Sequence, residues 1–269
     1  MINYEIYTHV EESDKDDVIN YMIYSHTEFL DLLNIQYDHL QGRGHLTLCI
    51  NKNDLDLENL YKKYDHVVFY DGNLTYGQKL LSCINQVDYE YILLLHDIDI
   101  VFEANNVRIL ELLHFLKKND FDRVDFQLAY DFNSTHRDTI GDDNLHLVKS
   151  SNTDTRSQGY PFNVQPSIWK KETLTKILHK FSHLGYRTIE QDVVQEFAVQ
   201  FNIFKLFEKR SYRCGYLTCL SPFKYLHLTH GRELLRLENL KPEECVDIVE
   251  PYNTIVDKYK LKESHRWKN

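Results

Sequence analysis

The sequence predicts an α/β fold, with a Rossmann-like, mostly parallel central sheet flanked by helices. Short apolar runs alternate with segments of helical periodicity from residue 18 to about residue 130. Strands and helices that alternate in this way form parallel sheets covered on both faces. The 269 residues, 42% of them hydrophobic, suit one sizeable core, and no linker or internal repeat divides the chain. We therefore predict a single domain, 1–269, with one lobe at about 1–130 and another at about 131–269.

The elements of the first lobe follow one another in a regular order. Strands are predicted at 18–25, 45–51, 66–72 and 89–97, and helices at 28–40, 56–64 and 76–87. The helix at 56–64 begins with acidic residues and ends with basic ones, as the helix dipole favours.

The second lobe is less regular. Its predicted elements are a strand at 125–133, a polar loop from Asp131 to Gly159, a short turn at 160 that leads into a helix ending at 178, a helix at 188–201, a strand at 225–233 that turns at Gly231, and a helical tail at 242–261.

Composition excludes several classes of protein. The net charge of -10 argues against a nucleic-acid-binding or anionic-membrane surface. No apolar segment is long enough to span a membrane, and the N-terminus lacks the pattern of a signal peptide. Five scattered cysteines indicate a reducing compartment. These features predict a cytoplasmic protein, and the abundance of Asn, Asp, Lys, Ile and Tyr is compatible with a viral or bacterial source.

Polar residues follow all four predicted strands of the first lobe. In parallel α/β sheets, ligands bind beyond the carboxyl ends of the strands. The residues at these ends are Ser25 and His26, then Asn51, then Asp71, and finally His96, Asp97 and Asp99. Their agreement over four strands predicts a ligand site at this edge of the sheet.

The pair formed by Asp97 and Asp99 is distinguished by its position and not by its spacing. Three other Asp-x-Asp pairs, at 14–16, 54–56 and 120–122, lie in hydrophilic stretches where solvated carboxylates are expected. Two like charges at the end of a buried strand repel each other unless a cation or hydrogen-bond donors offset them. Mg²⁺ and Mn²⁺ prefer such oxygen ligands. The position favours metal and nucleotide binding, and the alternative is that the two carboxylates cap the next turn.

Three segments carry a resemblance to a known family. They are NLTYGQKLLSCINQVDYEYILLLHDID at 73–99, NVQPSIWKKETLTKIL at 163–178 and EQD at 190–192. In this order they resemble the acidic metal-binding motif and the acceptor-side motifs of GT-A-fold glycosyltransferases, over roughly residues 18–195. The sequence departs from the family pattern at two residues, because His96 precedes the acidic pair and Ile98 lies between its two members, and neither residue identifies the donor.

The resemblance implies a nucleotide-diphosphate sugar donor, such as a UDP- or GDP-sugar, and a glycan or glycoconjugate acceptor. It also implies Mn²⁺ or Mg²⁺, with Asp97 and Asp99 as ligands and the first lobe as the donor half. Nucleoside and diphosphate contacts are expected from the residues at the strand ends, namely Ser25, His26, Asn51, Asp71 and Asp97.

An inverting glycosyl transfer needs a base that removes the acceptor proton. The resemblance assigns this role to Asp192, with Glu190 as the second candidate. Gln191 stands where the family pattern has a Glu, so the match is imperfect. The alternative is that both are ordinary acidic residues favoured at the start of a helix.

Other candidates lie in the second lobe. Trp169 is expected to stack on a sugar with Gln165 nearby, although core packing beneath the helix explains the tryptophan equally well. The resemblance suggests His230 as a late metal ligand, and Arg232 is placed to meet the diphosphate. A surface histidine and a solvated arginine are the alternatives.

Three rival interpretations remain open. Cys214, Cys219, His227 and His230 have a spacing only superficially like a zinc site. A sugar-phosphate nucleotidyltransferase also uses a nucleotide and a metal, but it normally carries a Gly-rich basic loop near the N-terminus, which this sequence lacks. A non-catalytic GT-A-like glycan-binding protein is the third. For the glycosyltransferase, peripheral membrane association through a partner is compatible with the sequence.

Overall fold

The computed structural model describes residues 18–26, 30–51, 61–126, 137–139, 145–149, 160–208, 217–220, 223–227, 229–230, 233–234 and 246–261. Of residues 30, 31, 137–139, 145–149, 205–208, 217–220, 223, 224, 227, 229, 230, 233, 234 and 246–248, only the backbone is described.

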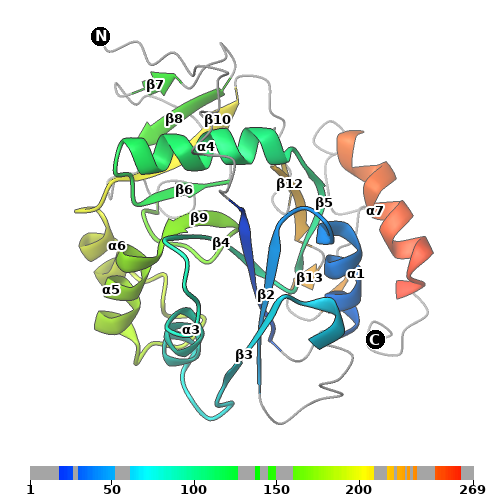
Figure 1. Ribbon diagram of the computed structural model, residues 1–269, viewed down its shortest axis with the longest axis horizontal. Coiled ribbons are helices and arrows are strands. Elements are labelled where there is room, and N and C mark those ends of the chain that lie inside the picture. The colour runs from blue at the N-terminus through cyan, green and yellow to red at the C-terminus, as the bar shows by residue number, and fades with distance from the viewer. Residues whose placement is uncertain are drawn as a thin grey trace.

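The first lobe forms four parallel strands in the spatial order β3-β2-β1-β4 (Figure 1). They are β1 (Asn20–Tyr24), β2 (His45–Asn51), β3 (His66–Tyr70) and β4 (Tyr91–His96). The helices α1 (Leu30–Leu40) and α3 (Tyr76–Ile84) connect them, and residues 61–63 are also helical. All four predicted strands are therefore confirmed.

The second lobe extends the same sheet. β9 (Ser167–Lys170) runs antiparallel between β4 and β6 (Arg123–Asp125). Beyond them lie β10 (Ile203–Glu208), β8 (Leu145–Lys149) and β7 (Arg137–Thr139), which completes a sheet of nine described strands. Only β9 and β8 run against the others. The predicted Rossmann-like, mostly parallel α/β fold is thus confirmed.

A smaller sheet branches off directly after β4. β5 (Asp99–Ala104) begins three residues after the end of β4 and pairs with β12 (Phe223–His227), which pairs in turn with β11 (Leu217–Leu220). β13 (Thr229–His230) and β14 (Glu233–Leu234) form a separate antiparallel pair. The short turn between β4 and β5 therefore joins two sheets.

Helices cover both faces of the large sheet, because its strands are apolar on both sides. In β1, Tyr21 and Ile23 belong to one core cluster, which includes residues of α1 and of α4 (Asn106–Lys118). Met22 and Tyr24 belong to the other, with residues of α3, α5 (Lys171–Phe181) and α6 (Asp192–Ala198). The C-terminal helix α7 (Val246–Lys258) lies beside α1, where the hydroxyl of Tyr259 donates a 2.6 Å hydrogen bond to Asp38 (Figure 1).

Two sequence-based expectations about the second lobe were wrong. The segment at 160–178 was expected to turn directly into a helix, but Ser167–Lys170 form β9 and the helix begins only at Lys171. Ile168 and Trp169 are buried between two strands, and such β-branched and aromatic residues favour a strand there. The expected loop at 131–159 contains β7 and β8. Most of the strand expected at 125–133 lies outside the described residues. In the described part of the chain, no helix is long and apolar enough to cross a membrane.

Candidate functional site

The carboxyl ends of β1 and β4 bring Ser25, His26 and Asp97 together. Parallel pairing places Tyr24 beside His96, so the residues that follow the two strands are neighbours. The hydroxyl of Ser25 and the backbone N–H of His26 both donate to Oδ2 of Asp97, at 2.9 and 2.7 Å. Nδ1 of His26 lies 2.9 Å from Oδ1 of the same carboxylate. Asp97 is 0% exposed, so both its oxygens are held in a fixed orientation by protein donors.

Asp99 starts the smaller sheet. It is buried, and its backbone faces His227 in β12. Gln36 on α1 donates from Nε2 to the carbonyl of Asp99 at 2.7 Å and accepts from the N–H of Val101 at 3.0 Å. A side-chain amide that binds both backbone groups in this way fixes the start of β5. The sequence therefore places the two carboxylates at a rigid junction between sheets.

A cluster of six rings surrounds this junction: Tyr24, His26, Tyr70, Tyr76, His96 and Tyr186. The hydroxyl of Tyr76 lies 2.9 Å from Nε2 of His96, and that of Tyr70 donates to the carbonyl of Ser25 at 2.6 Å. These contacts give His96, whose role the sequence left open, a structural partner. The rings of Tyr24, Tyr70, Tyr76 and His96 are buried, so they shield the strand ends from solvent.

Glu190 approaches the same rings from the other lobe. Its Oε1 accepts a 2.8 Å hydrogen bond from the backbone N–H of Val164. The pKa of Tyr76 is raised well above its usual value by burial, and also by the charges of Tyr186, Glu190 and Asp99. Burial raises the pKa of Tyr186 in the same way, and Asp99, Glu190 and Asp97 add to the effect. The acidic pair and Glu190 therefore act on the same two phenols.

Asp192 lies differently from Glu190, although only one residue separates them. It is exposed in the first turn of α6, where the helix dipole favours an acidic residue. Glu190 is half-buried and hydrogen-bonded. Of the two predicted bases, Glu190 is thus the one whose charge acts on the rings around Asp99.

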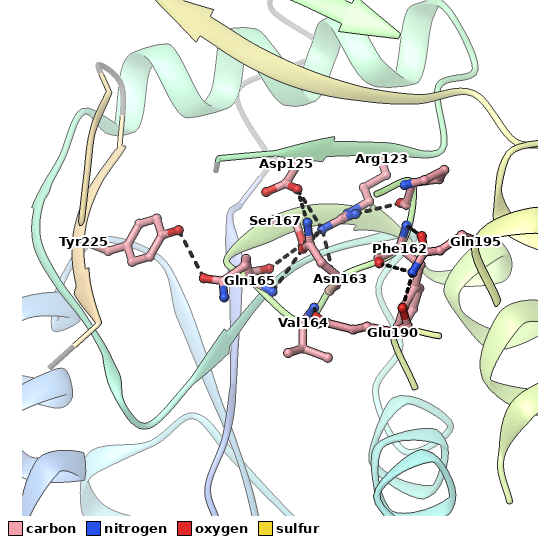
Figure 2. Close-up of polar contacts among 11 residues, drawn as sticks. Arg123, Asp125, Phe162, Asn163, Val164, Gln165, Ser167, Glu190, Gln195 and Tyr225 are labelled. Carbon is pink, nitrogen blue, oxygen red and sulfur yellow. Dashed lines mark hydrogen bonds and ion pairs between the residues drawn. The ribbon is translucent and has the colours of Figure 1, made fainter. Parts of the chain in front are cut away.

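A buried polar network lies beneath the loop at 161–165, whose Val164 N–H binds Glu190 (Figure 2). Arg123, which is completely buried, donates to the carbonyl of Pro161 at 2.7 Å and to Ser167 Oγ at 3.2 Å, and it contacts the amide oxygen of Asn163. It also forms an ion pair with Asp125 at 3.3 Å. Burial lowers the pKa of Arg123, and the charge of Asp125 opposes this shift. The guanidinium therefore ties β6 to the loop before β9.

Gln195 fixes the other side of this loop (Figure 2). Its Oε1 accepts from the N–H of Phe162 at 2.9 Å, and its Nε2 donates to the carbonyls of Phe162 and Glu190 at 2.8 and 3.0 Å. At the far end of the loop, the hydroxyl of Tyr225 on β12 donates to Gln165 Oε1 at 3.4 Å. The loop thus connects Glu190 with the sheet that carries Asp99.

The remaining strand-end candidates lie at β2 and β3. Asn51 ends β2, and its amide lies so close to Gly72 that a Cβ there would come within 2.3 Å of Asn51 Nδ2. Asp71 is exposed, and its Oδ1 accepts from the backbone N–H and the side-chain amide of Asn73 at 2.9 and 3.0 Å. Both predicted residues thus lie at the expected edge of the sheet.

Trp169 occupies a different environment from the one expected for a sugar-binding residue. It is 0% exposed in β9, and the Arg123 guanidinium lies 4.5 Å from the centre of its ring. Its position corresponds to the core-packing alternative, and we do not place it in the acceptor site. Gln165 is half-buried and belongs to the network described above.

The late candidates are described only in part. His227 ends β12 and His230 ends β13, and their side chains lie outside the described residues. Arg232 and Cys214 also lie outside them, while Cys219 is described only as backbone in β11. Metal ligation by His230, diphosphate binding by Arg232 and the zinc spacing therefore stay predictions.

The donor set at the β4–β5 junction fits a hard divalent cation, because carboxylate oxygens are the preferred ligands of Mg²⁺ and Mn²⁺. Asp97 is buried and oriented by Ser25 and His26. Among the side chains that the structure describes, no three His, Cys, Asp or Glu residues form a group able to hold a metal ion. Asp97 and Asp99 would therefore need water, substrate or residues beyond the described set to complete a coordination shell.

Sequence reasoning missed the residues that make this region rigid. Tyr186 and Tyr76 are two of 19 tyrosines, and nothing local marks them as neighbours of the acidic pair. Arg123, Asp125 and Asn163 carry one signal in the sequence. Each is a polar residue beside apolar residues that are buried in the structure, and such a position indicates a buried polar contact.

No protein-family model matches the chain, and no curated protein matches it either. Solved structures do resemble it. Apo UDP-glucose pyrophosphorylase has a TM-score of 0.47 and 12% identity, covering 91% of this chain and 100% of that one. A cytidylyltransferase from Leptospira borgpetersenii has a TM-score of 0.44 and 13% identity, covering 94% and 97%. S. aureus TarS 1–349 has a TM-score of 0.44 and 12% identity, covering 71% of this chain and only 58% of the TarS chain. At these values the matches carry no functional argument.

Proposed function

We propose that this chain is a glycosyltransferase that moves a sugar from a nucleotide-diphosphate sugar to a hydroxyl of a glycan or glycoconjugate. The observation that carries the proposal is the pair of buried carboxylates at the carboxyl end of β4, with a third carboxylate, Glu190, acting on the same rings from the other lobe. Ligands of parallel sheets bind at this edge. The two groups of carboxylates suit two tasks, which are to hold the donor and to activate the acceptor.

On the donor side, Asp99 and Asp97 are the residues that would hold Mn²⁺ or Mg²⁺. The ion, when bound, would offset the negative charge of the diphosphate as it leaves. Ser25 and His26 orient the carboxylate of Asp97 through three hydrogen bonds, so we propose that they position Asp97 as a metal ligand. Asn51 and Asp71 at the neighbouring strand ends are proposed to contact the nucleoside. Arg232 is proposed to contact the diphosphate, and His230 to complete the metal shell.

On the acceptor side, a carboxylate takes the proton of the acceptor hydroxyl. The acceptor oxygen then forms a bond to the anomeric carbon while the bond from that carbon to the diphosphate oxygen breaks, and the nucleoside diphosphate leaves with the electron pair. Glu190 is the better supported base because it is held by Val164 and acts on the rings beside Asp99. Asp192 stays as the second candidate. This assignment applies to an inverting reaction.

A thermal-shift panel tests the proposal. The protein is heated with UDP- and GDP-sugars, each with and without Mn²⁺ or Mg²⁺. We expect a nucleotide sugar to raise the melting temperature only when the metal is present, because ligands that bind the native state stabilise it. If no nucleotide sugar shifts the melting temperature under either condition, the proposal fails.

A pyrophosphate-release assay separates the proposed reaction from nucleotidyl transfer. In the described structure the first strand, β1, is followed in the sequence by Ser-His-Thr-Glu-Phe at 25–29, which contains no glycine, lysine or arginine. Such a segment is a poor cradle for a triphosphate. We therefore expect no release of pyrophosphate from UTP, CTP or GTP with sugar 1-phosphates. Release of pyrophosphate would show that the protein is a nucleotidyltransferase and not a glycosyltransferase. Donor binding without turnover would indicate a non-catalytic GT-A-like glycan-binding protein.

A further inference from the structure

Tyr186 is an exposed aromatic residue that is nevertheless held in a fixed place. Its side chain is 39% exposed. The ring lies edge-on to that of His26, with centroids 5.3 Å apart, and to that of Tyr76 at 5.2 Å, and it contacts His96 at 5.8 Å. An exposed tyrosine on an ordinary loop would lose conformational freedom on binding a ligand. The ring of Tyr186 is already held in place by these contacts, so binding a ligand would cost it little further conformational entropy.

The segment before Tyr186 is anchored to the start of α3. The hydroxyl of Thr75 donates to the carbonyl of Ser182, and the N–H of Gly77 donates to the carbonyl of Leu184 at 3.2 Å. A Cβ at position 77 would lie 2.9 Å from the carbonyl oxygen of Ser182. Only glycine allows this close approach, so the sequence fixes where the chain leaves α5 and where Tyr186 comes to rest.

The surroundings of Tyr186 suit a neutral, hydroxyl-rich ligand. The ring of His26, which lies against Tyr186, is itself 2.9 Å through Nδ1 from the carboxylate of Asp97, so carboxylates lie close to this phenol. Burial, and after it the charges of Asp99, Glu190 and Asp97, raises the pKa of Tyr186, so the phenol stays protonated. Within the described part of the chain, its hydroxyl makes no hydrogen bond with a protein group. Carboxylates accept hydrogen bonds from sugar hydroxyls, and aromatic rings pack against the C–H faces of sugars.

We propose that Tyr186, with the partly exposed ring of His26 beside it, is the surface on which the acceptor sugar packs. The role is the one that the sequence suggested for Trp169, which the fold buries. Tyr186 and the proposed base Glu190 lie in one compact turn, in which the N–H of Ile189 donates to the carbonyl of Gly185 at 3.0 Å and that of Gln191 to the carbonyl of Thr188 at 3.2 Å. A sugar on the ring of Tyr186 would therefore bring a hydroxyl towards Glu190. This inference rests on the proposed glycosyltransferase function, because it names where the acceptor of that reaction binds.

Saturation-transfer NMR with methyl glycosides of glucose, galactose, mannose and N-acetylglucosamine tests the surface directly, without any nucleotide. Tyr186→Ala is compared with wild type and with Tyr61→Ala, which removes another tyrosine that is 56% exposed and whose ring packs on Phe69 instead of on the rings around Asp97. We expect wild type and Tyr61→Ala to bind at least one glycoside, and Tyr186→Ala to bind it about three- to tenfold more weakly. Tyr186→Phe, which keeps the ring, should stay within about twofold to threefold of wild type.

The outcomes separate this inference from the proposed function. In the thermal-shift panel, Tyr186→Ala should keep the metal-dependent shift given by the nucleotide sugar, and in turnover it should raise the acceptor KM with little change in the donor KM. If Tyr186→Ala binds glycosides as wild type does, or if wild type binds none, the acceptor surface is wrong whatever the panel shows. Loss of the nucleotide-sugar shift in Tyr186→Ala would also overturn it, since Tyr186 would then serve the donor. If the wild-type protein binds glycosides at Tyr186 but no nucleotide sugar, the proposed glycosyltransferase function fails and the proposed sugar-binding surface stands.

Discussion

Two aspartates in this protein are equally buried but are held in opposite ways. Asp125 on β6 is 0% exposed and faces the guanidinium of Arg123, in the middle of the network that fixes the loop before β9. Asp97, after β4, is also 0% exposed, but its partners are a hydroxyl, a backbone N–H and the ring of His26, which itself reaches the surface. One carboxylate is balanced by a buried permanent cation, and the other is oriented by groups that carry no permanent charge.

These two environments suit different roles, one in stabilising the fold and the other in binding a ligand. An ion pair enclosed in a core stabilises only while it is complete, because either member alone is a buried, uncompensated charge. A carboxylate whose partners carry no permanent charge, and which has a second carboxylate two residues away, is by contrast a suitable ligand for a cation. We therefore read Arg123 and Asp125 as part of the scaffold, and Asp97 and Asp99 as part of the site.

The largest effect on stability is expected at the scaffold. Asp125→Asn removes the charge that balances Arg123 and should lower the free energy of unfolding by about 3 to 5 kcal/mol. The matched control is Asp120→Asn, because Asp120 is 81% exposed in its ion pair with Lys170 and should lose at most about 1 kcal/mol. Urea denaturation of the three proteins measures both values. Equal losses for the two variants would end the distinction between a structural and an exposed ion pair here.

The next effect concerns the site and should appear in binding instead of folding. Asp99→Asn keeps the shape of the side chain but removes a ligand charge, so the Mn²⁺-dependent shift by a nucleotide sugar should disappear while the protein stays folded. Circular dichroism provides the control for folding. If the shift survives in Asp99→Asn and is lost instead in Asp125→Asn protein that remains folded, the roles assigned to the two regions must be exchanged.

A smaller, more selective effect is expected from the second lobe. Glu190→Gln should leave the nucleotide-sugar shift unchanged and lower kcat by about 10²-fold or more, because a general base contributes roughly that much. Asp192→Asn, two residues away and exposed, is the matched control and should reduce kcat far less. The opposite ranking of the two variants in a turnover assay would restore Asp192 as the base.

The features of the fold and the site that could be predicted are those that depend on residues close together in the sequence. The four strands around the site were predicted because each is a short apolar run, and the polar residues after them marked the edge where Asp97 and Asp99 lie. β9 was misassigned because its strand state depends on pairing with β4 and β6, which lie far away in the sequence. Two hydrogen-bond partners of Arg123, Pro161 and Asn163, lie 38 and 40 residues downstream, so the sequence pattern did not reveal them either. No sequence pattern marks Tyr186, because its ring neighbours His26, Tyr76 and His96 come from three different segments.

The smallest predicted effect tests whether the two regions communicate. The hydroxyl of Tyr225, on the strand that pairs with β5, bonds at 3.4 Å to Gln165 in the loop held by Arg123. Tyr225→Phe removes this bond while the ring stays in place, which should cost about 0.5 to 1 kcal/mol of stability by urea denaturation. Because Asp97 and Asp99 are fixed by Ser25, His26 and Gln36, we expect the metal-dependent nucleotide-sugar shift to stay the same. A weakened shift in Tyr225→Phe would mean that the scaffold also tunes the site, and that the buried ion pair contributes to donor binding through Gln165.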